Sequence, residues 1–173
     1  MKESNFAREM RASFESFGHF YLKIPDAIPA VGANNKNGPR FIPPKPFDAI
    51  AVWRGISIAM EYKQHKSDTQ AFRFDRLAAH QKESLILHSD SGGLSFVIIN
   101  VRVPRRINRV HVIPIKKWIC LELSFSSNRK SLPAERLKKI EGLSRIKRGD
   151  KYIWDIKSYL EKRYLGFLMG DKL

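Results

Sequence analysis

The first apolar pattern in the chain has the period of an α-helix. Four apolar residues recur at intervals of three or four positions, namely Phe6, Met10, Phe14 and Phe17. Because residues at this spacing share one face of a helix, the pattern predicts a helix over residues 4–17. Gly18 suits the left-handed residue that often ends a helix. A short strand over residues 19–24 is predicted to follow.

The middle of the chain contains apolar runs that are typical of β-strands. Residues 47–53 and 56–62 are two such runs joined by a short Arg-Gly turn, and their β-branched content predicts a hairpin of buried strands. Residues 94–101 form an almost unbroken apolar run, which indicates a central strand covered on both faces. A further strand is predicted over residues 110–115.

Helical patterns occupy much of the remaining chain. They predict helices over residues 72–87, 118–125, 133–140 and 152–164. Residues 145–149 are predicted to form a solvated basic link, and the Pro- and Gly-rich residues 25–46 a long basic loop. The order of these elements predicts a single mixed α/β domain over residues 1–173.

The amino-acid composition and net charge indicate which class of molecule the protein binds. The hydrophobic share of 43% and the charged share of 28% are close to those of ordinary globular proteins, which excludes general disorder and coiled-coil arrays. Lys and Arg number 32 against 17 Asp and Glu, for a net charge of +15. This charge favours a polyanionic partner, and nucleic acid is preferred to an anionic membrane surface because the basic residues are spread along the chain.

Cysteine content and hydropathy predict a cytoplasmic protein. A single cysteine, Cys120, forms neither an intramolecular disulfide nor a cysteine-based zinc site. The first residues lack the apolar core of a signal peptide, and no apolar stretch approaches the 18 or so residues of a membrane span. We therefore expect no membrane partner.

Three ionisable residues occupy the strands of the predicted hairpin. Asp48 begins the first strand, and Glu61 and Lys63 lie near the end of the second. Positions i and i+2 of a strand share a face, and the antiparallel partner can place Asp48 opposite them. Two close carboxylates favour a cation between them, and their hard oxygens suit Mg²⁺, with Mn²⁺ able to substitute. An exposed strand edge is the alternative, but strands that are apolar on both faces favour a functional site.

These residues match a known pattern. Pro46-Phe47-Asp48 followed by Glu61-Tyr62-Lys63 resembles the PD-(D/E)xK nuclease signature. The surrounding sequence resembles the RecU-type Holliday junction resolvases over nearly the whole chain. The segments that carry this second resemblance are His80-Gln81, residues 92–99, residues 129–132 and residues 152–156.

The resemblance implies a restriction-endonuclease-like core, in which a central mixed β-sheet is flanked by helices. It also implies that Asp48 and Glu61 bind the metal, that Lys63 assists the nucleophilic water and that Gln81 is an active-site amide. A glutamine on a helix is otherwise usually solvated, so the assignment of Gln81 depends on the motif around it.

A further metal ligand is expected from the first helix, where these nucleases tend to supply an acidic residue. Glu3 lies on the apolar face of the predicted helix, whereas Glu9 is rotated by about 100° from Met10. Glu3 is therefore preferred, and a plain solvated glutamate is the alternative for either residue.

The implied reaction is hydrolysis of DNA by paired symmetric nicks in a four-way junction. A two-fold homodimer would present the two sites that this reaction needs. Basic residues on either side of the site are expected to contact phosphates without reading sequence: Lys36, Arg40, Lys45, Lys66, Arg73 and Arg76. Residues 25–46 are shorter than the RecU stalk that they replace, and Phe47 stands where that family has Thr, which indicates a divergent relative.

Two other functions remain open at this stage. The chain could be another PD-(D/E)xK endonuclease that acts on duplex, nicked or flapped DNA. It could also be a basic DNA-binding protein without catalysis, whose carboxylates are vestigial. Cleavage of different substrates, with and without metal, separates these functions.

Overall fold

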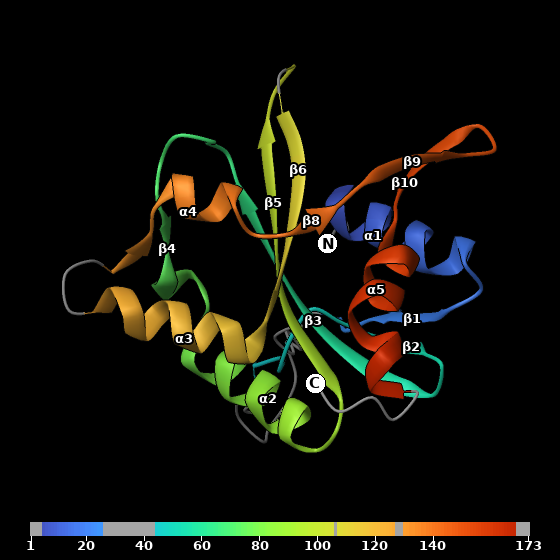
Figure 1. Ribbon diagram of the computed structural model, residues 1–173, viewed down its shortest axis with the longest axis horizontal. Helices are drawn as coiled ribbons and strands as arrows, with labels where there is room; N and C mark the ends of the chain where they lie inside the picture. Colours follow the sequence, from blue (N-terminus) through green and yellow to red (C-terminus); the bar gives the residue numbers. More distant parts are fainter. Residues whose placement is uncertain (1–4, 26–43, 106, 127–129, 169–173) are drawn as a thin grey trace, which may run out of the picture.

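A six-stranded mixed sheet forms the centre of the computed structural model, which describes residues 5–25, 44–105, 107–126 and 130–168 (Figure 1). The order across the sheet is β1-β2-β3-β5-β6-β8. These strands are β1 (Phe20–Lys23), β2 (Ala49–Trp53), β3 (Ile56–His65), β5 (Leu94–Val103), β6 (Ile107–Pro114) and β8 (Gly142–Leu143). β3 and β5 run parallel, and the other neighbours are antiparallel.

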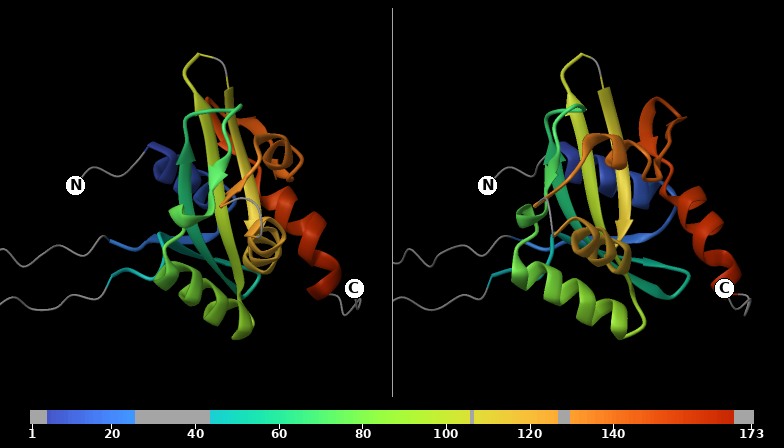
Figure 2. Two further views of the ribbon diagram at one scale, coloured as in Figure 1. Left: turned by 90° about the vertical axis from the view of Figure 1, so that its left-hand side faces the viewer. Right: turned by 60° about the vertical axis from the view of Figure 1, so that its left-hand side comes forward.

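Helices cover both faces of the sheet (Figure 1, Figure 2). One face carries α1 (Asn5–Ser16) and α5 (Ile156–Leu168), and the other carries α2 (Ala79–Asp90), α3 (Ile115–Ser126) and α4 (Ala134–Lys138). Two small antiparallel ribbons complete the fold: β4 (Phe72–Arg73) with β7 (Ser131–Leu132), and β9 (Arg145–Arg148) with β10 (Lys151–Trp154). A short helix, η1 (Phe74–Arg76), follows β4. No helix in the described part of the chain is long and apolar enough to cross a membrane.

The central strands are apolar on both faces because each face covers a separate core. Met60 of β3 packs in the core beneath α1 and α5, together with Phe14. Its neighbour Ala59 faces the other core, which includes Leu85 of α2 and Trp118 of α3. Successive side chains of a strand point to opposite faces, so a strand between two helical layers needs apolar residues at nearly every position.

The predicted fold class is confirmed: the chain is mixed α/β, with a central mixed sheet flanked by helices. The predicted hairpin is present as β2 and β3, although β3 continues to His65. The strands predicted over residues 94–101 and 110–115 are β5 and β6. Each extends further than predicted at the end that leads into the turn between them.

One predicted helix was placed wrongly at its start. Residues 72–87 were expected to be helical throughout, but α2 begins only at Ala79. Phe72 instead pairs with Leu132 in the β4–β7 ribbon, and the Phe74 ring packs against Trp118 with 5.4 Å between ring centroids. These partners are distant in the sequence, so a local pattern does not reveal them.

The predictions of a link over residues 145–149 and of a helix that starts at residue 152 were also wrong. The expected basic link is strand β9, and residues 152–154 belong to β10 rather than to the last helix, which begins at Ile156. Gly149 has a φ of +58° at the turn between the two strands, a conformation that glycine adopts readily. Ile153 is buried beside Trp154, and this burial fixes the ribbon against the domain.

Candidate active site

The backbone of β3 positions the first carboxylate of the candidate site. Asp48 lies immediately before β2, and its N–H donates to the carbonyl oxygen of Met60 at 3.0 Å. Its side-chain Oδ2 accepts a hydrogen bond from the N–H of Tyr62 at 2.9 Å. The sheet register therefore places the Asp48 carboxylate beside Glu61, as the hairpin pattern predicts.

Lys63 connects β3 to the first turn of α2. Its Nζ donates to Glu61 Oε1 at 2.7 Å and to Gln81 Oε1 at 3.0 Å. The same Gln81 oxygen accepts from the N–H of Ala78 at 3.2 Å, at the start of the helix. Gln81 is thus buried and bonded rather than solvated, and the structure brings it together with Asp48, Glu61 and Lys63.

Burial and charge together act on Glu61. Its side chain is only 3% exposed, and burial is the main cause that raises its pKa above the ordinary value. The nearby negative charge of Asp48 raises the pKa further, and the hydrogen bond and charge of Lys63 oppose this rise. Glu61 Oε2 is buried without a hydrogen-bond partner among the described residues. A buried carboxylate oxygen without a partner is costly and is well suited to a cation.

The donor set fits a hard divalent cation. Asp48 and Glu61 offer carboxylate oxygens, and the buried Oε2 of Glu61 accepts no hydrogen bond from a described residue. Mg²⁺ is often held by one or two carboxylates and keeps several waters. No group of three or more His, Cys, Asp and Glu residues assembles within the described ranges.

Lys45 is part of this cluster. Its Nζ lies 2.5 Å from Asp48 Oδ1, and its side chain is 21% exposed. A phosphate contact was predicted for Lys45 from the sequence, and this ion pair was not. The spacing of three residues from Asp48 is the signal that indicates it.

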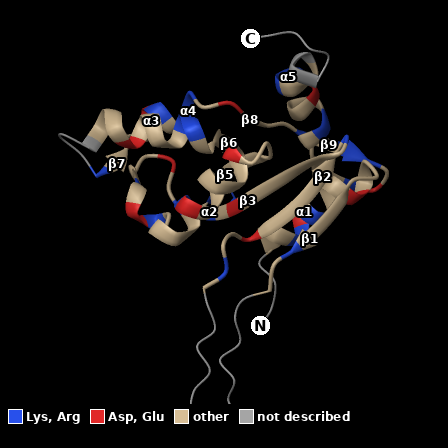
Figure 3. Ribbon diagram, turned by 90° about the horizontal axis from the view of Figure 1, so that it is seen from below, with Lys and Arg blue, Asp and Glu red and all other residues tan. Residues whose placement is uncertain are grey.

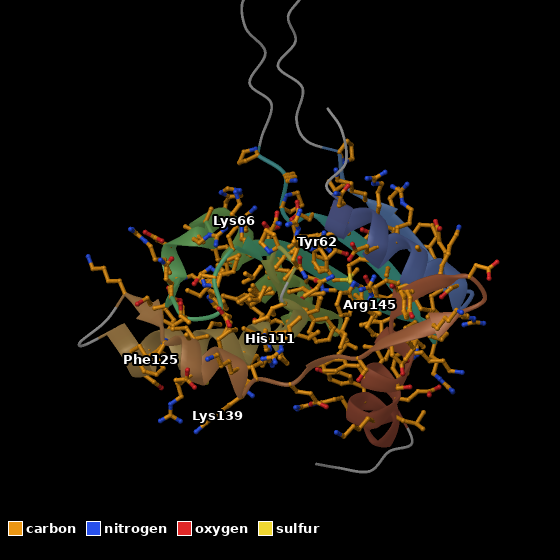
Figure 4. All side chains as sticks on the ribbon, turned by 90° about the horizontal axis from the view of Figure 1, so that it is seen from above. Tyr62, Lys66, His111, Phe125, Lys139 and Arg145 are labelled. Carbon is orange, nitrogen blue, oxygen red and sulfur yellow. The ribbon has the colours of Figure 1, made fainter. Side chains whose placement is uncertain are left out.

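The other basic residues expected to contact DNA have different surroundings. Arg73 pairs with Asp75, and Arg76 donates to the carbonyl oxygen of Gln64 at 2.7 Å. Lys66 is exposed just beyond β3 (Figure 4). Lys36 and Arg40 lie outside the described residues. Lys and Arg positions occur on many elements rather than on one helix (Figure 3).

Two glutamates, Glu3 and Glu9, were considered as further metal ligands. Glu3 lies outside the described residues. Glu9 accepts hydrogen bonds from Arg102 at 2.6 Å and from Trp154 Nε1 at 3.1 Å. Both of its oxygens are therefore engaged in a network separate from the carboxylate pair.

Comparison with known proteins places these residues within a family. Residues 36–160 match the family model described as Recombination protein U, or RecU, and this range includes the whole cluster from Lys45 to Gln81. Among solved structures, the chain is similar to Hjc, a Holliday junction resolvase from the archaeal hyperthermophile Archaeoglobus fulgidus. Sequence identity is 18%, the TM-score is 0.42, and the similarity covers 66% of this chain and 78% of that chain. Comparison with curated proteins gave no match.

Proposed function

The chain belongs to the RecU family of Holliday junction resolvases, and from this premise we propose that Asp48, Glu61, Lys63 and Gln81 are its active site. A resolvase acts in recombination as a nuclease on DNA junctions. The proposed reaction is hydrolysis of one phosphodiester bond per site, with paired symmetric nicks near the crossover. The observation that carries this proposal is the close cluster of two carboxylates, a lysine and an amide.

Asp48 and Glu61 are the proposed ligands of a divalent cation, Mg²⁺ or Mn²⁺. When bound, such an ion offsets the charge that develops on the scissile phosphate and lowers the pKa of a water. The hard carboxylate oxygens support this assignment, and so does Glu61 Oε2, which bonds to none of the residues that the structure describes. Glu3 stays a prediction as a third ligand.

Lys63 is the proposed partner of the attacking water. An ammonium group has three N–H donors, and two of them go to Glu61 and Gln81. The third donor can bind the water or a non-bridging phosphate oxygen as negative charge develops. The water oxygen forms a bond to phosphorus and releases a proton to solvent, while the bond from phosphorus to the sugar oxygen breaks and that oxygen takes a proton from solvent.

Gln81 is the proposed positioning residue for Lys63. Its Oε1 bonds both to Lys63 Nζ and to the N–H of Ala78, so it fixes the ammonium group relative to the first turn of α2. Lys45 is proposed to neutralise Asp48 before a metal binds, because its Nζ contacts Asp48 Oδ1.

We also propose that two copies of the chain act together, because a junction needs two cuts and each chain supplies one site. The supporting surface is an apolar patch on β1 and β2, made of the cross-strand pairs Phe20–Val52 and Leu22–Ile50. Phe20 and Leu22 are 57% and 53% exposed, on the edge strand of the sheet. Exposed apolar patches often mark protein interfaces.

A cleavage assay tests the catalytic proposal. Labelled four-way junction, matching duplex, nicked and flapped DNA are incubated with Mg²⁺ or with EDTA. We expect paired junction nicks that need Mg²⁺ and that fall about 10³-fold in Glu61→Gln. Glu83→Gln, an exposed position on α2, is the matched control and should cut as the wild type does.

Three results separate the proposal from its alternatives. Loss of cutting in Glu61→Gln with junction binding retained supports the active site. Equal cutting of plain duplex assigns a less selective endonuclease. Tight binding without cutting under any divalent metal assigns a DNA-binding protein without catalysis.

A further inference from the structure

An open hollow of about 530 Å³ lies at the end of the sheet, between the β5–β6 hairpin and the β9–β10 ribbon. The hairpin projects beyond the rest of the sheet, with the ribbon to one side of it (Figure 1, Figure 2). The polar and charged residues that line the hollow are Glu9, Arg102, Arg105, Asn108 and Arg145. Neither the predicted site nor the family match assigns a role to this hollow.

The hollow opens on the opposite face of the sheet from the active site. Lys63 is in register with Ile99, and Arg102 follows Ile99 by three residues on the same strand. An odd separation along a strand reverses the face, so Arg102 points to the side of α1. Its bond to Glu9 of α1 agrees with this placement.

The charge of the hollow is positive and largely uncompensated. Glu9 is its acidic residue, and both carboxylate oxygens of Glu9 are already bonded, to Arg102 and to Trp154. Arg105 and Arg145 form no ion pair with any described residue. Two cations therefore face the hollow with no ion-pair partner among the described residues.

The ribbon holds one of these arginines in a fixed orientation. The guanidinium of Arg145 lies over the ring of Tyr152, 4.9 Å from its centroid. Tyr152 is 59% exposed, and its register partner Lys147 shares the same face of the ribbon. A guanidinium stacked on a ring keeps its N–H groups available for phosphate oxygens. In Figure 4, Arg145 and Lys66 lie on opposite sides of Tyr62.

The hairpin tip holds the other arginine in a strained conformation. Arg105 has a φ of +60°, a region that glycine or asparagine usually occupies and that costs an arginine free energy. This conformation belongs to the turn between β5 and β6, so glycine at position 105 would fit the same backbone and remove only the side chain.

We propose that this hollow, with Lys147 and Tyr152 beside it, binds the phosphate backbone of a duplex arm of the junction. This second DNA contact rests on the proposed function, and it adds a surface on the far face from the catalytic carboxylates. Arg102 lies three residues beyond the register partner of Lys63, roughly 10 Å along the strand.

The test compares two variants that lose the same number of positive charges. The hollow variant combines Arg105→Gly, Arg145→Gln and Lys147→Gln. The control variant combines Lys117→Gln, Arg136→Gln and Lys139→Gln, which are exposed positions on α3, on α4 and directly after α4. Arg105→Gly suits the local backbone, and it is also measured alone as a variant that keeps the fold. Circular dichroism checks each protein.

Binding to a four-way junction is measured in EDTA between 50 and 200 mM salt, and hydroxyl-radical footprinting maps the protected phosphates. We expect the hollow variant to bind about tenfold more weakly at 100 mM salt. Its salt slope should fall by roughly 2 to 3, since each lost phosphate contact removes about 0.9. One block of arm phosphates should lose protection, while single-turnover cleavage at saturating protein stays within about twofold of the wild type.

Equal binding and equal footprints for the hollow and control variants overturn the proposal. Wild-type protein that binds junctions but does not cut them overturns the catalytic proposal alone, because the binding comparison still tests the hollow. Wild-type protein that does not bind junction DNA overturns both.

Discussion

Glu61 is a residue whose surroundings change its chemistry. In water its carboxyl is ionised at neutral pH, but in the fold it is buried beside Asp48, and both burial and this charge raise its pKa. The protonated form is therefore favoured in the metal-free protein over a wider pH range than in an unfolded chain. Since a metal needs the ionised carboxylate, protons and the cation compete for this residue.

The first prediction concerns this titration. In metal-free protein, Asp48→Asn should lower the pKa of Glu61, because the second cause of its rise is removed. Cleavage by the wild type should therefore increase as the pH rises through the raised pKa of Glu61, because the ionised carboxylate binds the metal. Cleavage should decrease at lower pH, where Glu61 is protonated. Carbon-detected NMR of the Glu61 carboxyl measures the shift. Asp90→Asn, on the exposed end of α2, should leave the titration unchanged.

A second prediction at this scale concerns Gln81. Gln81→Ala removes one of the two groups that hold Lys63 and frees the N–H of Ala78. We expect kcat to fall by about 10 to 100-fold with little change in KM, because a slightly misplaced catalytic group costs rate more than binding. Gln81→Glu keeps the acceptor oxygen and should recover part of the rate. A loss confined to KM would assign Gln81 to DNA binding instead.

At the scale of elements, α2 is fixed at both ends against the sheet. Its first turn bonds to Lys63 through Gln81, and near its last turn His88 lies between Ser57 at 2.8 Å and Ser95 at 2.9 Å. These two serines belong to β3 and β5. The helix therefore joins the two central parallel strands, and its orientation determines where the Gln81 amide lies.

The prediction for this element concerns the stability cost of adding a side chain at Gly93. A Cβ at position 93 would lie 2.1 Å from the His88 ring, which two hydrogen bonds hold in place. Gly93→Ala should therefore lower the free energy of unfolding by about 1 to 3 kcal/mol, measured by urea denaturation. In a His88→Ala background the same change should cost much less, because the clash is gone. Equal losses in the two backgrounds would contradict this explanation.

At the scale of the whole molecule, charge and apolar surface are arranged separately. Lys and Arg are distributed over the two faces of the sheet (Figure 3), while Phe20, Leu22 and Val52 form an exposed apolar patch on β1 and β2. A positive net charge of +15 opposes self-association, so a dimer needs an apolar contact of this kind. One domain over residues 1–173 stays a prediction that the two cores on a single sheet support.

The prediction at this scale concerns the oligomeric state of the protein. Leu22→Glu places a charge in the apolar patch and should shift the protein from dimer to monomer in sedimentation velocity. Leu87→Glu changes an equally apolar side chain, 70% exposed on α2, and should leave the mass unchanged. A wild type that sediments as a monomer, or a dimer that Leu22→Glu leaves intact, would place the second copy elsewhere.

The sequence alone determined those features that depend on neighbours along the chain. The period of Phe6, Met10 and Phe14 gave the first helix, and the spacing of Glu61 and Lys63 set both side chains on one face of a strand. Both follow from the fixed repeat of regular secondary structure. The net charge likewise indicates a polyanionic partner, because a sum of charges does not depend on how the residues are arranged in space.

The tertiary structure alone decided what depends on distant partners. Phe72 pairs with Leu132 instead of starting a helix, and Tyr152 lies in a ribbon because burial favours its neighbours there. The bond of Gln81 to Lys63 requires the packing of α2 on the sheet. The sum of charges also did not reveal where Arg105 and Arg145 face a common hollow. Such contacts form between segments far apart in the chain, and no local period encodes them.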